Sequence, residues 1–127
     1  MDESFSRHHR LRHRREFLLV YGEGSKAHGR LVVIFARRRP DGGPWRLGIT
    51  ATRRLGKAVV RNRLRRRIRE IFRRRNPRPP DGWDFVVNLK HPAVEAPFDE
   101  LLREIERLLA RLEPRPPAPP APESSVT

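Results

Sequence analysis

The chain has 127 residues, of which 29 are Lys or Arg and 15 are Asp or Glu, so its formal net charge is +14. Arginine supplies 26 of the basic residues, which favours planar, bidentate contacts to phosphate. The absence of cysteine excludes a disulfide scaffold, a thiolate zinc site and a cysteine nucleophile. No apolar run approaches the ~20 residues of a membrane helix, and no signal-peptide core is visible. We therefore expect one soluble, cytoplasmic domain with a polyanionic partner, no membrane association and no small-molecule substrate.

The positive charge is concentrated in two blocks. Residues 53–75 carry a net charge of +11, residues 7–15 carry +5, and the rest of the chain sums to −2. A diffuse excess would indicate solubility, whereas a concentrated excess indicates a contact surface.

The N-terminal half predicts a short helix followed by two strands. Residues 1–15 are rich in His and Arg, and we expect them to be mobile until bound. Residues 14–21 predict a short helix that stops at glycine, although composition alone also permits a strand. The β-branched run in 30–38 and the alternating pattern of 45–52 predict two strands. Because a Pro-Asp-Gly-Gly turn at 40–43 separates them, we expect an antiparallel hairpin.

The C-terminal half predicts two helices around one further strand. Residues 59–75 have helical periodicity, with an apolar arc of about 120° made by Val60, Leu64, Ile68, Ile71 and Phe72. Residues 84–89 predict a strand, and Pro97 opens a second amphipathic helix that reaches Leu112. We expect residues 1–7 to be flexible, 8–112 to form the domain, and the proline-rich stretch 113–127 to be a disordered tail.

The basic helix is the main functional candidate. Arg61, Arg65 and Arg69 form one row beside the apolar arc, and Asn62, Arg66 and Arg73 form the next row. Such a strip suits phosphates, and the amide adds both a donor and an acceptor. The simpler interpretation is a solvated face, but only Glu70, toward Arg66 and Arg74, offers the expected ion pairing. A major-groove DNA helix is the rival interpretation, although no helix-turn-helix unit precedes this segment.

The polar face of the second predicted strand is another candidate. It combines Thr50 and Thr52 with Arg46 and Arg54, and Gly48 leaves room for close approach. If Val33 and Phe35 point the same way, this face resembles the platforms that bind single-stranded RNA. Phe17 and Tyr21, one helical turn apart, are placed to wall one side. The alternative for each aromatic residue is ordinary core packing.

We predict no catalytic residue and no metal ligand in the chain. The acids are scattered, and no carboxylate pair stands near a histidine. His8, His9 and His13 could bind a metal, but a basic arm that contacts phosphate explains them more simply. No glycine-rich phosphate loop is present.

Residues 47–70, with Arg61-Asn62-Arg63 at their centre, resemble the central block of the bacterial ribonuclease P protein family. Upstream, Arg10-Leu11-Arg12, Glu16-Phe17, Tyr21 and Gly24-Ser25 are similar to the N-terminal part of that family. The resemblance extends over residues 8–112. It implies an α-β-β-β-α-β-α sandwich with a small mixed sheet and a left-handed β-α-β crossover, like the second domain of a small-subunit ribosomal protein. It also implies a fourth strand, which we place near residues 26–30.

The resemblance implies a function as well. In such proteins a large RNA subunit with Mg²⁺ is the catalyst, and the protein binds that RNA and the 5′ leader of precursor tRNA. The chain would then assist the endonucleolytic removal of the leader while binding no cofactor tightly. By position, the contacts to the catalytic RNA would be Arg61, Asn62, Arg63, Arg65, Arg66 and Arg69. The leader cleft would be lined by Phe17, Tyr21, Val33, Phe35, Thr50, Thr52 and Arg54.

One alternative remains open at this point. The same helix could serve a non-catalytic basic protein that is associated with RNA or with the ribosome as a structural component.

The chain differs from the family pattern at two aromatic positions. The family often carries Phe at the position of Tyr21 and Tyr at that of Phe35, so the hydroxyl group has moved while both positions stay aromatic.

Overall fold

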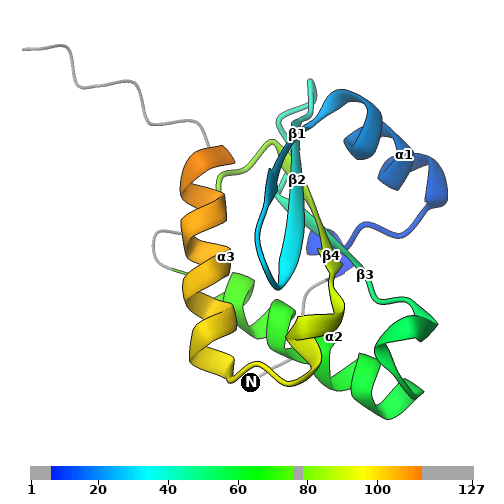
Figure 1. Ribbon diagram of the computed structural model, residues 1–127. Coiled ribbons are helices and arrows are strands. Elements are labelled where there is room, and N and C mark those ends of the chain that lie inside the picture. The colour runs from blue at the N-terminus through cyan, green and yellow to red at the C-terminus, as the bar shows by residue number, and fades with distance from the viewer. Residues whose placement is uncertain (1–6, 76–78, 113–127) are drawn as a thin grey trace, which may run out of the picture.

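The computed structural model describes residues 7–75 and 79–112 and has the predicted order of elements (Figure 1). The main elements are α1 (Arg14–Glu23), β1 (Ser25–His28), β2 (Val32–Arg38), β3 (Arg46–Thr50), α2 (Ala58–Arg74), β4 (Trp83–Leu89) and α3 (Phe98–Leu112). Three short 3-10 turns accompany them, η1 (Arg7–His9), η2 (Arg53–Leu55) and η3 (His91–Val94). The order α-β-β-β-α-β-α is confirmed, including the short strand expected near residues 26–30. The proline-rich tail 113–127 and most of the expected flexible segment 1–7 lie outside the described residues.

The four strands form one mixed sheet in the order β1-β2-β4-β3. β2 is antiparallel to both β1 and β4, whereas β3 is parallel to β4. The predicted antiparallel hairpin between residues 30–38 and 45–52 is therefore wrong, because β4 lies between the two strands. The true hairpin of the sheet is β1–β2.

Hydrophobicity on both faces explains why β4 takes an interior position, between β2 and β3. Phe85, Val86 and Val87 are consecutive and fully buried, so each face of the strand packs against a layer of helix. β2 instead alternates buried and half-buried residues, and β3 buries only Leu47 and Gly48. α2 provides the crossover that parallel neighbours such as β3 and β4 require.

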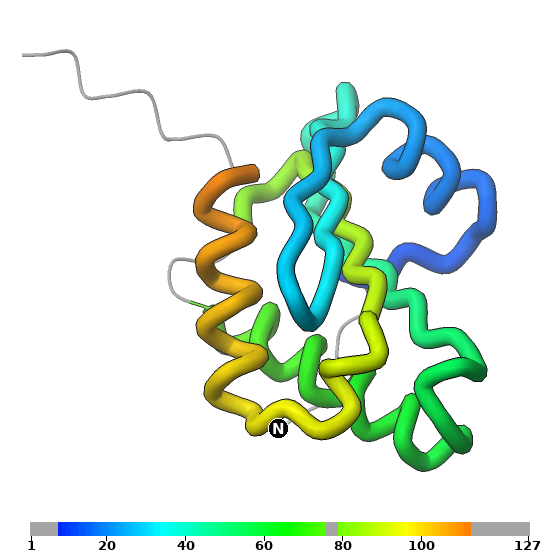
Figure 2. Tube along the Cα trace, viewed as in Figure 1, coloured from blue at the N-terminus to red at the C-terminus, as the bar shows by residue number. Residues whose placement is uncertain are grey.

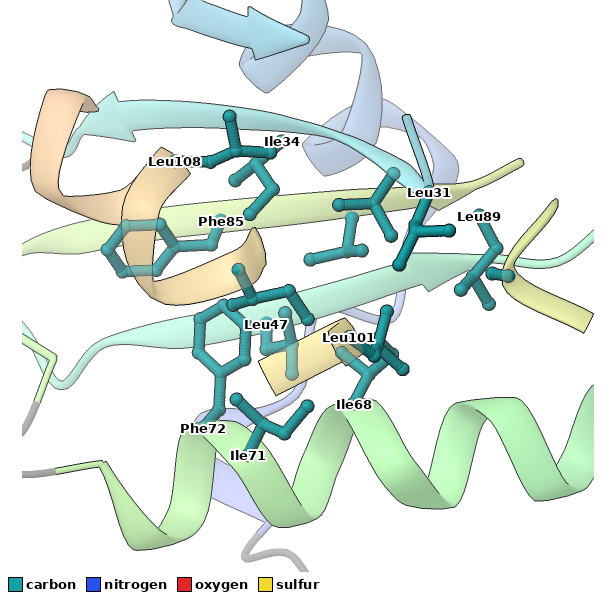
Figure 3. Packing of buried hydrophobic residues seen from close by; sticks show 14 of the residues in the cluster. Leu31, Ile34, Leu47, Ile68, Ile71, Phe72, Phe85, Leu89, Leu101 and Leu108 are labelled. Carbon is teal, nitrogen blue, oxygen red and sulfur yellow. The ribbon is translucent and has the colours of Figure 1, made fainter. Parts of the chain in front are cut away.

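The helices occupy both faces of the sheet. α3 contacts β1 and β2, and α1 contacts β2 and β4 from the opposite side (Figures 1 and 2). The main core lies between the sheet and the pair α2 and α3, where Phe72, Phe85, Leu101 and Leu108 pack together (Figure 3). A smaller apolar cluster lies beneath α1 and is centred on Val20 and Val86.

The apolar arc predicted for the basic helix is confirmed. Leu64, Ile68, Ile71 and Phe72 are buried, and Val60 is half-buried near the start of α2. The ring of Phe72 lies 5.7 Å from that of Phe85, centroid to centroid, so α2 is docked firmly on the sheet. Its arginine-rich side therefore has a fixed orientation.

A buried carboxylate in α3 fixes the turn between β1 and β2, and no sequence pattern indicated it. Glu104 accepts hydrogen bonds from the backbone N–H groups of Leu31 at 2.7 Å, Val32 at 2.9 Å and Arg30 at 3.1 Å. These bonds satisfy backbone donors that would otherwise be buried without partners.

The segment before α1 is packed on the sheet, which corrects the expectation that residues up to Arg15 are mobile. Leu11 is buried, its N–H donates to the carbonyl of Leu47 at 3.0 Å, and Arg10 forms a bridge with the same residue. The ring of His9 stacks on Trp45 with centroids 4.1 Å apart. Burial of Leu11 and pairing with the edge of β3 hold this segment in place.

α1 begins at Arg14 as predicted, and it ends two residues later than predicted, at Glu23. Gly24 follows the helix in an extended conformation, so a left-handed cap does not explain the glycine. Space explains it instead, because a Cβ atom there would lie 2.6 Å from the carbonyl oxygens of Ala36 and Val20.

Candidate nucleic-acid interface

The sheet face beneath α1 consists of three rows of residues that are paired across the strands. The charged row contains Arg37, Asp84 and Arg46. The middle row contains Lys26, Phe35, Val86 and Gly48. The open row contains His28, Val33, Asn88 and Thr50.

The charged row anchors the N-terminal end of α1. The buried carboxylate of Asp84 accepts two bonds of 2.9 Å from Arg46 and one of 2.6 Å from Arg39. Arg46 also donates to Glu16 of α1 at 2.8 Å. The hydrogen bonds to Asp84 raise the pKa of Arg46, since they favour its charged form over the burial that opposes it.

Glu16 has a lowered pKa because of the same arrangement. Burial alone would raise this pKa, but the backbone N–H groups of His13 and Arg12 and the charge of Arg46 together outweigh it. Both N–H groups lie 3.1 Å from one carboxylate oxygen, so Glu16 closes the first turn of α1.

The middle row is covered by aromatic side chains of α1. Phe17 lies directly over Gly48, where a Cβ atom would be 2.5 Å from its ring carbon Cζ. The ring of Tyr21 meets that of Phe35 edge to face, with centroids 4.8 Å apart and planes at 76°. Because Phe17, Tyr21 and Phe35 are all half-buried, part of each ring remains accessible.

The open row meets the tip of Tyr21. The tyrosine hydroxyl donates to Oδ1 of Asn88 at 3.0 Å and lies 3.1 Å from Oγ1 of Thr50. We call Tyr21, Phe35, Thr50 and Asn88 the Tyr21 cluster. All four are half-buried, so this cluster combines aromatic faces with neutral polar groups that solvent can reach.

Five of the seven residues expected to contact a leader are brought together on this face, namely Phe17, Tyr21, Val33, Phe35 and Thr50. Thr52 and Arg54 are not on it, because β3 ends at Thr50 and the chain turns into η2. Both are exposed in the connection to α2. The sequence did not single out Asn88, whose signal is an amide side chain that follows three consecutive apolar residues of β4.

The outer side of α2 carries most of the arginines that the sequence singled out. Asn62 and Arg66 are exposed, Arg61, Arg65 and Arg69 are half-buried, and Arg65 donates to Oδ1 of Asn62 at 3.1 Å. Together with Arg10, these five residues form what we call the α2 arginine surface.

Arg63 does not share this surface. At about 100° per residue it points roughly 160° away from Arg65, and its Nη2 lies 3.5 Å from the carbonyl oxygen of Val94. Arg67 lies on the same flank and donates to the carbonyl of Ala96 at 3.2 Å. The six residues Arg61, Asn62, Arg63, Arg65, Arg66 and Arg69 thus occupy two sides of the helix.

Arg10 joins the α2 arginine surface from the N-terminal segment. Its Nε is buried and has no hydrogen-bond partner among the described residues. Partial burial lowers the pKa of Arg69, and the nearby positive charges of Arg10 and Arg65 lower it further. Glu70 pairs with Arg74 as expected, and its second partner is Arg73 and not Arg66. Like charges therefore crowd together here, an arrangement that a bound polyanion relieves.

A pocket beside Arg10 extends the basic region toward α1. Its lining consists of His8, Arg10, Arg12, His13, Glu16 and Arg46. Within residues 7–75 and 79–112, no three His, Asp or Glu side chains are grouped as metal ligands. No helix in that part of the chain is long and apolar enough to cross a membrane.

A four-stranded mixed sheet with an arginine-rich crossover helix and an aromatic, amide-bearing face defines a small basic α/β protein of the RNA-binding class. The family model described as Ribonuclease P matches residues 5–113. A ribonuclease P protein component of Thermotoga maritima is 43% identical over 109 residues, covering 85% of each chain. One from Symbiobacterium thermophilum is 41% identical over 103 residues, covering 81% of this chain and 90% of the relative.

Solved structures agree with the sequence comparison. The RNase P protein of Thermotoga maritima superposes with a TM-score of 0.74 at 37% identity, covering 83% of this chain and 98% of that one. The RNase P protein of Staphylococcus aureus has a TM-score of 0.74 at 26% identity and covers 81% and 94%. The chain belongs to the ribonuclease P protein family. It is a protein subunit of the endoribonuclease ribonuclease P, which acts in tRNA processing.

Proposed function

We propose that the chain binds the ribonuclease P RNA through the α2 arginine surface and the 5′ leader of precursor tRNA through the face beneath α1. The alternative role, as a basic RNA- or ribosome-associated structural protein, is not favoured, because the comparisons lead to ribonuclease P components. The single observation that carries the proposal is the close grouping of like charges at Arg10, Arg65 and Arg69 beside an aromatic face of different chemistry.

The α2 arginine surface suits a structured RNA. Its guanidinium groups are held on a helix whose other side is buried, so their positions are fixed before the partner arrives. Fixed forks of N–H donors match phosphate oxygens, and release of counterions from the RNA adds to the affinity. Arg63 would reach the same RNA only if the RNA also contacts the flank of α2 beside η3.

The face beneath α1 suits a single strand. Its accessible rings offer surfaces on which bases stack, and its hydroxyl and amide groups are neutral. Thr52 and Arg54, exposed in the turn between β3 and α2, would contact the strand where it leaves this face toward the catalytic RNA.

The chemistry would belong to the RNA. We propose that Mg²⁺ would be held mainly by the RNA subunit, where it would supply the activation of water for hydrolysis, and that this chain binds no Mg²⁺ tightly. The chain's own part is to hold the leader and to neutralise phosphates near it. Because the proposed substrate is precursor tRNA, we propose that this chain acts in the cytoplasm.

Reconstitution tests this proposal directly. Purified protein, a bacterial ribonuclease P RNA and precursor tRNA are combined at low Mg²⁺, and cleavage is compared with that by the RNA alone. We expect a clear gain with the protein present. If cleavage is no faster with the protein than with the RNA alone, the proposal is contradicted and a purely structural role is favoured.

Substitution of Phe17 separates leader binding from general affinity for RNA. Phe17→Ala should weaken the binding of precursor tRNA selectively, by roughly tenfold, because stacking with one base contributes about 1–3 kcal/mol. Leu18→Ala is the matched control, since Leu18 is exposed on the same helix. Equal losses for precursor and mature tRNA would refute the assignment of this face to the leader.

A further inference from the structure

The hydrogen bonds of the Tyr21 cluster leave specific groups available. A tyrosine hydroxyl has one proton, and Tyr21 donates it to Oδ1 of Asn88 at 3.0 Å. The contact between Tyr21 and Thr50, at 3.1 Å, must then use the proton of Thr50. The remaining capacity consists of two N–H groups on Asn88 and the lone pairs of Thr50 Oγ1.

The available donor on Asn88 is accessible. No described residue accepts a hydrogen bond from its Nδ2, and this atom is not among the buried polar atoms without a partner. Asn88 itself is half-buried in the open row, between Val33 on β2 and Thr50 on β3. A ligand that lies across this row therefore meets a donor and an acceptor on adjacent strands.

The chemistry of the row indicates a base edge as its ligand. Three of the four residues of the row, Asn88, Thr50 and Val33, carry no ionisable side chain, whereas phosphate would be attracted to the arginines of α2. The ring of Phe35 lies next to Asn88 and Thr50 through its contact with Tyr21, and it provides a stacking surface beside the polar groups. Stacking and edge hydrogen bonds together are the usual means of recognising an unpaired base.

We propose that Asn88 is a specificity-determining residue that reads the hydrogen-bonding edge of one nucleobase of the leader. Thr50 makes the second contact to that base. Tyr21 is a positioning residue, since its hydroxyl is hydrogen-bonded to the side chain of Asn88 at 3.0 Å and holds that side chain in place. This inference rests on the proposed function of the face beneath α1.

The position of Asn88 is what allows it to discriminate. Its backbone belongs to β4, one of the two interior strands of the sheet, and its Oδ1 is engaged by the Tyr21 hydroxyl, so Nδ2 is the group presented to a base. A base that presents a donor to Nδ2 leaves buried polar groups unpaired, which lowers affinity more strongly than the loss of a contact in water.

Affinity measurements with the reconstituted holoenzyme test the proposal. Each leader position of a precursor tRNA is replaced in turn by all four bases, and by an abasic nucleotide, and dissociation constants are compared. We expect one position where the four bases differ by at least tenfold. Asn88→Asp should change the order of preference there, because it replaces two N–H donors with an acceptor. Valine has nearly the same shape as threonine but no hydroxyl group. Thr50→Val should therefore reduce the difference in dissociation constant among the four bases to about twofold.

The outcomes are distinguishable. An unchanged order of bases in Asn88→Asp together with an unchanged spread in Thr50→Val would overturn the inference. The inference would also be overturned if the wild-type holoenzyme bound precursor tRNA more tightly than mature tRNA but showed no dependence on the leader base. In that case the proposed function would still stand. If affinity for precursor tRNA falls on 2′-deoxy substitution of the leader but not on base substitution, the protein recognises the ribose, and this result also overturns the inference. If precursor and mature tRNA bind equally, the proposed function itself fails.

Discussion

Single residues decide how closely α1 approaches the sheet. The absence of a side chain at Gly48 lets the ring of Phe17 rest on β3, and this places Tyr21, one turn later, above Thr50 and Asn88. A larger residue at Gly48 would lift the helix and break the contacts of the Tyr21 hydroxyl. The same glycine therefore controls both packing and the presentation of the Tyr21 cluster.

Gly48→Ala should destabilise the protein by about 1–3 kcal/mol, since an added Cβ atom would lie 2.5 Å from the ring of Phe17 and the neighbours are well packed. Denaturant titration measures this loss. The control is Gly22→Ala in α1, where nothing lies within 4 Å of an added Cβ atom. There the restriction of the unfolded chain should stabilise by up to about 1 kcal/mol. If both substitutions changed the free energy of unfolding in the same direction, this account would be contradicted.

At the scale of elements, α1 is attached at its two ends by different chemistry. Its C-terminal half packs through Val20 and Tyr21, whereas its first turn is held by Glu16 through Arg46 to Asp84. The polar attachment responds to pH and the apolar one does not. Acid should therefore loosen the start of the helix first.

Glu16→Gln tests this attachment. Because the pKa of Glu16 is lowered in the folded protein, its charge adds stability above its ordinary pKa, and that contribution is lost as the pH falls through the lowered value. We expect the variant to be less stable by about 0.5–1 kcal/mol at pH 6, and the difference from wild type to shrink below about pH 4. Denaturant titrations at both pH values measure it. A difference that persists unchanged at pH 3 would show that the charge of Glu16 contributes nothing.

Local patterns predicted the elements well, but they did not predict which strands pair. The apolar arc of α2 and the start of α1 follow from periodicity and from glycine and proline positions, which act over a few residues. The pairing of β3 with β4 depends on the burial of Phe85, Val86 and Val87 from both sides, and the turn at 40–43 gives no sign of it. The missed contributions of Asn88 and Arg10 have the same origin, since each meets its neighbour only when distant parts of the chain come together: Tyr21 of α1 for Asn88, and Leu47 of β3 for Arg10.

At the scale of the molecule, charge and hydrogen bonding are separated between two surfaces. α2 carries its arginines on the side away from the sheet, while the face beneath α1 pairs its own charges internally through Asp84 and Glu16. Within the α2 arginine surface, the positive charges of Arg10, Arg65 and Arg69 lie close enough to repel one another. Repulsion there opposes folding until an anion is bound.

Sulfate should therefore raise the melting temperature more than chloride does at equal ionic strength. An anion present at ten times its dissociation constant stabilises the folded state by about 1.4 kcal/mol, which corresponds to several degrees for a domain of this size. Arg65→Ala should raise the melting temperature in chloride, because it relieves repulsion, and should lose much of the increment from sulfate. Arg103→Ala removes the same charge from an exposed pair with Asp99 and should keep the full increment. If both variants respond to sulfate equally, stabilisation comes from general screening and the grouping at Arg10, Arg65 and Arg69 has no special role.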